Sequence, residues 1–267
     1  MASNPAFNRI NKDIRAGIQD RPVLSSDPSA IQDLYDQRSA SPWQRGRLSL
    51  DDVVMKTGAL FTLLACCAAA SWIATSSNAA LMAPAAYGSM FAGLAIGLVI
   101  AFKKTISVPL IVCYSALEGV LVGALSAMFE TAYPGIVTTA VIATGATFAG
   151  MFIGWKTGLI KVTSRARRIF GLALMGYLLF SVVNVIASFA GVGAGWGFGG
   201  NGPLGIGISI LGVGMASYSL AIDFDTIEKA VAAELPEKYS WLLAHGLIVS
   251  LVWLYLEILR LLARARR

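Results

Sequence analysis

Charged residues are scarce in this chain, and so are cysteine and histidine. Only 13% of the 267 residues are charged, whereas 56% are hydrophobic. Ordinary soluble domains contain about 25% charged residues, so this chain has too few charges to cover the surface of a soluble fold. The composition therefore excludes an ordinary soluble domain and favours a protein whose outer surface lies in lipid.

The three cysteines and the single histidine exclude two further kinds of site. Cys66 and Cys67 are adjacent and cannot easily meet disulfide geometry, and Cys113 also lies in an apolar run. We interpret all three as small buried hydrophobic residues. Because His245 is the only histidine, the chain cannot assemble a His/Cys metal cluster. We therefore expect no metal site and no cofactor.

Seven long apolar segments follow a polar N-terminal tail, residues 1–52. Each segment is close to the roughly 20 residues that cross about 30 Å of hydrocarbon. In lipid the backbone must satisfy its own hydrogen bonds, so these segments are predicted to be helices. They lack the polar/apolar alternation of an outer-membrane barrel. We predict an all-α integral membrane protein, a seven-transmembrane-helix bundle. The predicted spans are residues 53–75, 86–102, 106–128, 134–155, 169–190, 204–222 and 239–262.

Basic residues alternate between the connectors. Seven Lys or Arg residues precede the first predicted span, and the connectors after the second, fourth and sixth spans contain two, five and two. The other three connectors contain none. This positive-inside pattern predicts a multi-pass protein of the cell inner (plasma) membrane with a cytoplasmic N-terminus. It also explains the net charge of +6 without a nucleic-acid partner.

The end of the chain departs from that pattern. Seven full spans place Arg264, Arg266 and Arg267 on the outside. Either this is a tolerated exception to the rule, or the last segment does not fully cross.

Three pairs of glycines have the spacing of helix-packing motifs. They are Gly93–Gly97, Gly119–Gly123 and Gly150–Gly154, on the second, third and fourth predicted spans. Small residues four apart let helix backbones approach closely, which matters where lipid removes the hydrophobic driving force between helices. The pairs are either helix-packing contacts or chance matches, since the chain contains 27 glycines.

Several carboxylates lie inside the spans, where a charge is costly and needs a reason. Glu118 lies about twelve residues, or about 18 Å, into the third span. It is either a proton- or cation-responsive group or a hydrogen-bonded residue that joins helices. Asp223 and Asp225 close the sixth span, and residues at i and i+2 do not share a helix face. We expect Asp223 to face the pore and Asp225 to be an interfacial group.

The last span carries Glu257 and His245. Arg260 and Arg264 follow Glu257 at i+3 and i+7, so an ion-pair ladder along one helix face is one interpretation of this glutamate. The other is a titrating group in an ion pathway. His245 is either a proton relay or a hydrogen-bonded packing residue.

An enzyme is not expected. Ser209 and Ser217 are intramembrane serines, and His245 could serve as a base for one of them. However, the chain contains no G-x-S-x-G sequence, and nothing identifies an oxyanion hole.

The last two spans resemble a known family. The run SYSLAIDFDTI, the residues Pro236–Tyr239 and the run LVWLYLEILRLL are similar to the end of the Bax inhibitor-1/YccA family, also called the transmembrane Bax inhibitor motif family. Asp223 matches the first aspartate of that family, and Leu254–Glu257 matches its second motif with Glu in place of Asp. The runs NPAFNR and YSALEGVLVGALS resemble an actinobacterial branch of the family.

The resemblance implies a bundle with the C-terminal helix central and a pH-sensitive cation (calcium) leak. In the family the leak is gated by two acidic residues, which correspond here to Asp223 and Glu257. Two nearby carboxylates disfavour ionising together and can share a proton. Lys103 or Lys104 stands where some members have a basic partner.

The spacing of the two acidic residues leaves that pair open. If the last span begins near Tyr239, Glu257 lies about 27 Å along it, whereas Asp223 ends its own span. Either the last helix begins later or the pair does not form. The partners expected for a leak are the lipid bilayer and calcium ions or protons. The alternative function is a non-conducting regulator that binds a membrane-bound ATP-dependent protease, as some bacterial relatives are thought to do.

Overall fold

The computed structural model describes residues 46–103, 105–192, 197–198, 200 and 202–266. Within them, seven helices are long and apolar enough to cross a membrane, and no strand is present. The helices are α3 (Leu50–Ser77), α4 (Met82–Phe102, after a 3-10 turn at Ala79–Leu81), α5 (Val108–Ala132), α6 (Ile136–Lys156), α7 (Ser164–Phe189), α8 (Pro203–Ala232) and α9 (Tyr239–Ala265). The predicted all-α, seven-helix membrane bundle is confirmed. Most of the predicted tail, Lys104 and Arg267 lie outside the described residues.

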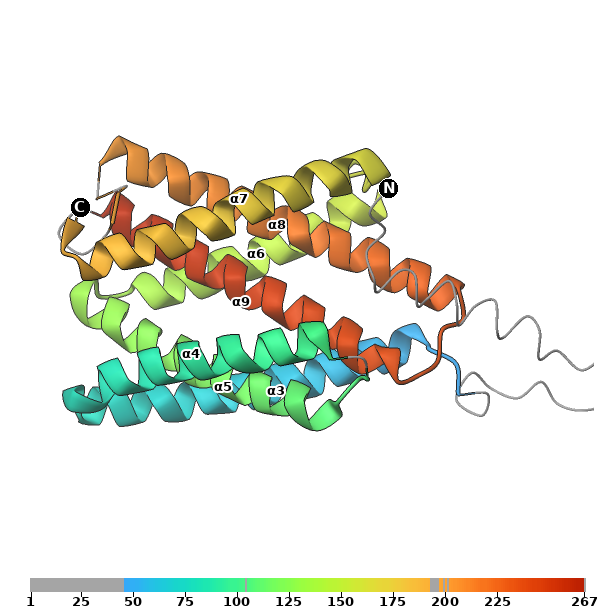
Figure 1. Ribbon diagram of the computed structural model, residues 1–267, viewed down its shortest axis with the longest axis horizontal. Helices are drawn as coiled ribbons and strands as arrows, with labels where there is room; N and C mark the ends of the chain where they lie inside the picture. Colours follow the sequence, from blue (N-terminus) through green and yellow to red (C-terminus); the bar gives the residue numbers. More distant parts are fainter. Residues whose placement is uncertain (1–45, 104, 193–196, 199, 201, 267) are drawn as a thin grey trace, which may run out of the picture.

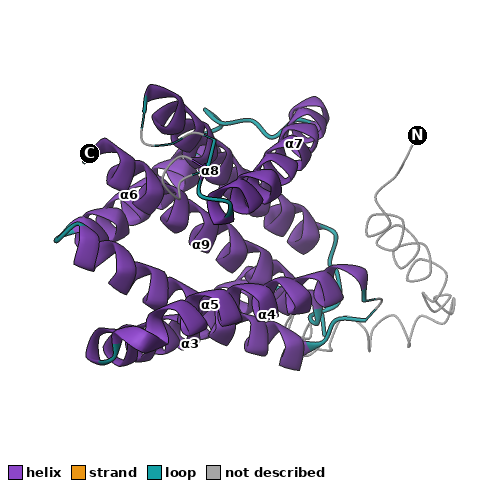
Figure 2. Cartoon of the chain, turned by 60° about the vertical axis from the view of Figure 1, so that its left-hand side comes forward, coloured by secondary structure: helices purple, strands orange, loops and turns teal. Residues whose placement is uncertain are grey.

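The C-terminal helix α9 runs through the middle of the bundle (Figure 1). On one side lies the α3–α4–α5 group, and on the other lies the α6–α7–α8 group (Figure 2). Of the most apolar 18-residue stretch of α9, 56% is buried, against 6% for α7. The predicted central position of the last helix is therefore confirmed, and α7 is peripheral. We call the end at which α3, α5, α7 and α9 begin the basic end, because Lys103, Lys156 and Lys238 lie there.

One of the three glycine pairs lets two helix backbones touch. A Cβ atom added to Gly119 would lie 2.4 Å from the Leu64 carbonyl oxygen, and one added to Gly123 would lie 2.2 Å from that of Ala68. Both oxygens belong to the backbone of α3, so neither can move aside. The contact between α3 and α5 therefore requires glycine at both positions, as the spacing predicts.

The other two pairs behave differently. Gly93 and Gly97 of α4 face side chains of α5 at 3.8 Å and 3.2 Å from the added Cβ, which is looser packing. Gly150 has open space around it, and Gly154 meets Ile160 in the connector that follows its own helix. This last pair is a chance match to the motif, because equal spacing does not reveal which face of a helix a neighbour covers.

Residues 46–52 belong to the bundle rather than to a separate tail. The Ser49 hydroxyl accepts from the Asp52 amide at 3.1 Å, and the Asp52 carboxylate accepts from the Ser49 amide at 3.0 Å, which caps α3. The Leu48 amide donates to the Leu235 carbonyl at 2.7 Å. Leu48 is buried against the end of α8, in a cluster with Val53 and Leu235. The start of the first span is thus attached to the connector between the last two.

Two sequence interpretations need correction. Cys66 and Cys113 are exposed on the outside of the bundle, and Cys67 is partly exposed; all three are free. The interpretation that all three are buried is wrong, because in lipid a small apolar side chain is equally stable on the outer surface. Helix α8 also extends to Ala232, ten residues beyond its predicted end, so Asp223 lies within the helix.

Candidate functional site

Asp223 lies at the contact between α8 and α9. It is partly buried, about 14 Å before the basic end of α8. The Ser250 hydroxyl of α9 donates a hydrogen bond to its Oδ2. Its Oδ1 would lie 3.8 Å from a Cβ on Gly246, one turn earlier on α9. The carboxylate therefore lies between the Ser250 hydroxyl and the space beside Gly246, where α9 has no side chain.

Asp225 faces a different neighbour. It pairs with Arg167 of α7 and, at 2.7 Å, with Lys229 of its own helix. The two aspartates of α8 thus have separate partners: Asp223 contacts α9, and Asp225 holds the start of α7 against α8.

Glu257 is almost completely buried, with 1% of its surface exposed. Its Oε1 accepts hydrogen bonds from Tyr177 of α7 at 2.7 Å, from the Trp253 indole at 3.1 Å and from Arg260 at 3.1 Å. The carboxylate is therefore the point at which α7 is bound to the central helix. The Glu257–Arg260 pair of the predicted ladder is present.

Arg264, two turns after Glu257 on α9, bonds to α8. It is buried, and its Nη1 donates to the Gly205 carbonyl at 2.6 Å and to the Ser209 hydroxyl at 2.8 Å. Both partners belong to the first turns of α8. A charge near the end of α9 is thus enclosed by protein instead of lipid, which lowers the cost of placing it at that depth.

The structure does not bring Asp223 and Glu257 together. Ser250, the partner of Asp223, lies seven residues before Glu257 on α9, or about 10 Å of helix rise. Glu257 instead faces Gly212, eleven residues before Asp223 on α8. Because α8 and α9 are antiparallel, moving forward along one means moving back along the other. The family-implied carboxylate pair is replaced in this chain by a carboxylate and a hydroxyl.

Glu118 lies in a third polar cluster, between α4, α5 and α9. Glu118 Oε1 would lie 3.8 Å from a Cβ added to Gly93 of α4, and Tyr114 lies one turn before Glu118 on α5. The Tyr114 ring also packs edge-on against His245 of α9, with ring centroids 4.6 Å apart. Within the described residues the buried Nδ1 of His245 has no hydrogen-bond partner. Tyr114, one turn from Glu118, thus contacts the central helix.

The basic partner suggested by the sequence is not at the site. Lys103 is exposed just after α4 and forms no ion pair within the part of the chain that is described, and Lys104 lies outside that part. The basic residue that lies near the two aspartates of α8 is Arg167. It bonds Asp225 and is close enough to Asp223 to interact with it electrostatically.

Sequence reasoning overlooked Ser250, Tyr177 and Arg167. Ser250 carried a usable signal, since it is a serine within an apolar run, two turns before Glu257 and so on nearly the same helix face. No sequence signal pointed to Tyr177 or Arg167, because their contacts depend on how α7 packs against α8 and α9. No group of three or more His, Cys, Asp or Glu residues that could hold a metal ion occurs among the described residues.

Comparison with known proteins agrees with this architecture. No curated protein matches the chain. A family model described as Bax inhibitor 1 like matches residues 4–267, which is almost the whole chain. That match covers all seven helices and the α8–α9 contact at Asp223 as well as the motifs at the end of the sequence. This multi-pass membrane protein therefore belongs to the Bax inhibitor 1 like family.

Proposed function

We propose that this protein is a pH-sensitive cation leak channel that conducts calcium, and that Asp223 is its titrating group. The observation that supports it is the Asp223–Ser250 contact between α8 and the central helix. A carboxylate at membrane depth is costly and usually marks an ion or proton pathway. Among the described residues, the one hydrogen bond that Asp223 receives comes from a neutral hydroxyl, so the carboxylate is not neutralised by a bonded cation.

The chemistry of the contact suits a proton-controlled cation path. Ionised Asp223 accepts from Ser250 and attracts calcium, which prefers oxygen ligands. Protonation removes the charge and gives the carboxyl a donor of its own, which changes both the attraction for a cation and the bond to α9. A single carboxylate with a hydroxyl partner performs this switching here. The proposal assigns no catalytic chemistry to the chain.

The proposed setting is the cell inner (plasma) membrane, with the basic end in the cytoplasm. Supporting this orientation, the connectors that carry clustered Lys and Arg residues all lie at that one end of the bundle. In a variant without Cys66, Cys67 and Cys113, a cysteine replacing Ser77 should react with an impermeant thiol reagent added to intact cells. One replacing Ser164 should not. Labelling at Ser164 alone would reverse the orientation.

Calcium flux from proteoliposomes tests the function. The wild-type protein should release trapped calcium at a rate that depends on pH, and Asp223→Asn should flatten that dependence because an amide does not titrate. Ser250→Ala should shift its midpoint, since the carboxylate loses its donor. Asp225→Asn is the matched control: it removes a carboxylate two residues away and should change the pH profile less.

Two outcomes would overturn the proposal. Equal effects of Asp223→Asn and Asp225→Asn would remove Asp223 from the gate. An absence of flux from correctly folded wild-type protein would favour the second candidate, a non-conducting regulator that binds a membrane-bound ATP-dependent protease.

A further inference from the structure

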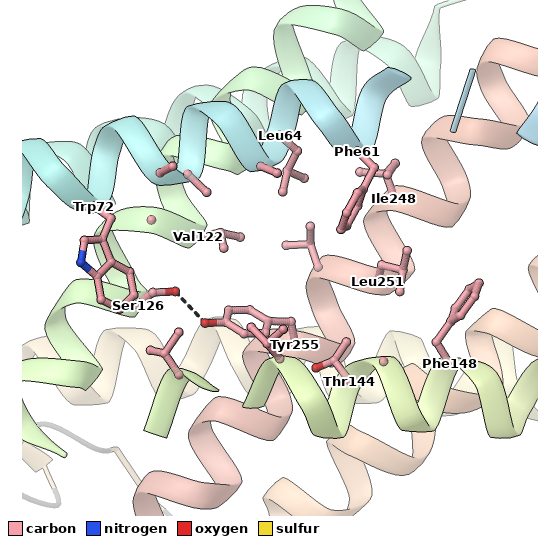
Figure 3. A pocket seen from close by; sticks show the side chains of 18 of the residues that line it. Phe61, Leu64, Trp72, Val122, Ser126, Thr144, Phe148, Ile248, Leu251 and Tyr255 are labelled. Carbon is pink, nitrogen blue, oxygen red and sulfur yellow. Dashed lines mark hydrogen bonds between the residues drawn. The ribbon is translucent and has the colours of Figure 1, made fainter. Parts of the chain in front are cut away.

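The groove between α3 and α6 has no means of recognising a lipid by its charge. Figure 3 shows the residues that line it, and none of the described residues there is charged. The Ser126 and Tyr255 hydroxyls bond each other at 2.7 Å, and Thr144 donates to the Ala140 carbonyl of its own helix at 2.7 Å. A surface that selects a charged partner therefore lies elsewhere on the bundle.

The connector between α6 and α7 carries an unbalanced positive charge. Residues 156–168 contain five basic residues and no acidic residue. Arg167 pairs with Asp225 of α8. The other four are exposed and form no ion pair within the described residues: Lys156, Lys161, Arg165 and Arg168. Four cations are thus left here without a counter-charge from the described part of the chain.

The connector between α8 and α9 lies at the same end of the bundle but differs in charge. Its acidic residues neutralise basic residues of the first span: Glu234 pairs with Arg47, and Glu237 pairs with Lys56 at 2.8 Å. The positive-inside pattern requires basic residues at this end but does not require them to be unpaired. The cluster on the α6–α7 connector is therefore a local feature that orientation alone does not explain.

The four cations lie at the depth of lipid headgroups. Helix α6 has 21 residues, so it rises about 32 Å and reaches the edge of roughly 30 Å of hydrocarbon at its last residue, Lys156. Helix α7 has 26 residues and is about 39 Å long, which exceeds that layer by about 9 Å. If this excess is divided between its two ends, the hydrocarbon begins about 4 to 5 Å after Ser164. Arg165 and Arg168 lie about 1.5 Å and 6 Å along the helix, on either side of that boundary.

One face of α7 leads from these cations into the apolar layer. Arg165 and Arg168 are three residues apart and so share a helix face. Ile169 and Leu172 follow the two arginines at i+4, and they are 59% and 70% exposed. A phosphate group bound at the arginines would therefore have its acyl chains alongside exposed apolar side chains of the same helix.

The connector itself is held in place by the end of α6. The Ile160 amide donates to the Gly154 carbonyl at 2.9 Å, and the Gly158 amide donates to the Trp155 carbonyl at 3.0 Å. Gly158 has a φ of 74°, the left-handed conformation that commonly ends a helix. Between these bonds Leu159 is 83% exposed. An exposed apolar side chain among cations is typical of a surface that contacts anionic lipid at the membrane boundary.

We propose that Arg165 and Arg168 bind the phosphate of an anionic phospholipid, and that Lys156 and Lys161 add to the attraction for its negative charge. The arginine side chain matches phosphate oxygens with two parallel hydrogen bonds. Clusters of Lys and Arg beside a membrane-spanning helix attract anionic headgroups. A lipid without net charge carries a cationic group that this cluster repels. This binding does not depend on the protein conducting calcium.

Native mass spectrometry of the full-length protein in detergent tests the binding. The wild type should bind palmitoyl-oleoyl phosphatidylglycerol roughly tenfold more tightly than palmitoyl-oleoyl phosphatidylcholine, which has the same acyl chains and no net charge. The double variant Arg165→Gln/Arg168→Gln should weaken phosphatidylglycerol binding roughly thirtyfold, and Lys161→Gln alone roughly fivefold. All three side chains are exposed, so these changes should leave the fold intact. Lys103→Gln/Lys238→Gln is the matched control, because it removes two exposed positive charges from the same end of the bundle.

Four results would overturn the proposal. The first is equal binding of the two lipids, and the second is equal weakening by the arginine and lysine double variants, which would assign the effect to total charge. The third is displacement of the lipid by an equal concentration of glycerol phosphate, which would make a soluble phosphate the ligand. The last is an absence of phosphatidylglycerol binding to the wild type, which would favour an acidic protein segment as the partner of the cluster.

Discussion

The two sides of the central helix are held together in different ways. In the α3–α4–α5 group, Gly119 and Gly123 let the backbones of α5 and α3 touch. In the α6–α7–α8 group, α7 is barely buried and is attached through the Tyr177–Glu257 hydrogen bond and the Arg167–Asp225 ion pair. In lipid, close packing of small residues and polar contacts are the two main sources of helix association. The α3–α5 contact depends on small residues and the attachment of α7 depends on polar contacts, and the candidate titrating group lies on the same side as α7.

The largest loss of stability is expected when a larger side chain replaces glycine at the contact between α3 and α5. Gly123→Leu should destabilise the protein by about 3 kcal/mol, because the new Cβ would meet a backbone oxygen that cannot move. Thermal unfolding in detergent measures the loss. Gly150→Leu should change stability by less than about 1 kcal/mol, since the space around that glycine is open. Equal melting temperatures for the two variants would contradict the close packing of α3 on α5.

The polar side should respond next most strongly, at Glu257. Glu257→Gln keeps the shape of the side chain but removes the negative charge of the carboxylate whose Oε1 accepts three hydrogen bonds. Because hydrogen bonds to a charged group are stronger, the free energy of unfolding should fall by about 2 kcal/mol. The midpoint of the pH dependence of calcium flux should not change, since Glu257 does not contact Asp223. A shifted midpoint in a Glu257→Gln variant of normal stability would show that Glu257 takes part in controlling the flux. Arg260→Gln should cost less than about 1 kcal/mol, because Arg260 is 42% exposed.

A smaller effect is expected at the tyrosine that binds α7 to α9. Tyr177→Phe should cost about 1 kcal/mol, because it removes the hydroxyl that donates to Glu257. Tyr218→Phe on α8 is the control. The buried Tyr218 hydroxyl has no hydrogen-bond partner within the described residues, so its removal should be neutral or stabilising. If both variants lose the same stability, the hydrogen bond does not hold α7.

The smallest effect should come from the exposed lysine after α4. Lys103→Gln should change stability by less than about 0.5 kcal/mol and leave the pH profile of flux unaltered, because the residue is exposed. Arg167→Gln is the variant to compare with Lys103→Gln. It removes the cation beside both aspartates of α8 and should alter the profile. A profile that responds to Lys103 and not to Arg167 would reverse this assignment.

Hydropathy was sufficient to predict seven spans, because crossing hydrocarbon demands long apolar runs whatever the packing. It failed at the end of α8, where the helix continues for ten residues beyond the apolar part. Those residues include Asp225 and Lys229, which pair at i and i+4 and stabilise a helix that hydropathy does not detect. Placing Asp223 at a helix end followed from that error.

The partner of Asp223 was harder to predict. It depends on how far α9 is shifted along α8, and the connector between the helices sets that shift. A motif match on α9 pointed to Glu257, while the structure aligns Ser250 with the aspartate. The glycine pairs teach the same lesson. Spacing identified Gly119 and Gly123 correctly, but gave Gly150 and Gly154 equal weight although no other helix covers them.

The central position of α9 has a consequence for the order in which the protein is made. The helix that joins the two groups is the last of the seven to leave the ribosome, so the first six insert before their common core exists. Until then Asp223 has no Ser250 to bond, and Tyr177 has no Glu257. A chain cut before Tyr239 would therefore lack the α9 partners of Asp223 and Tyr177.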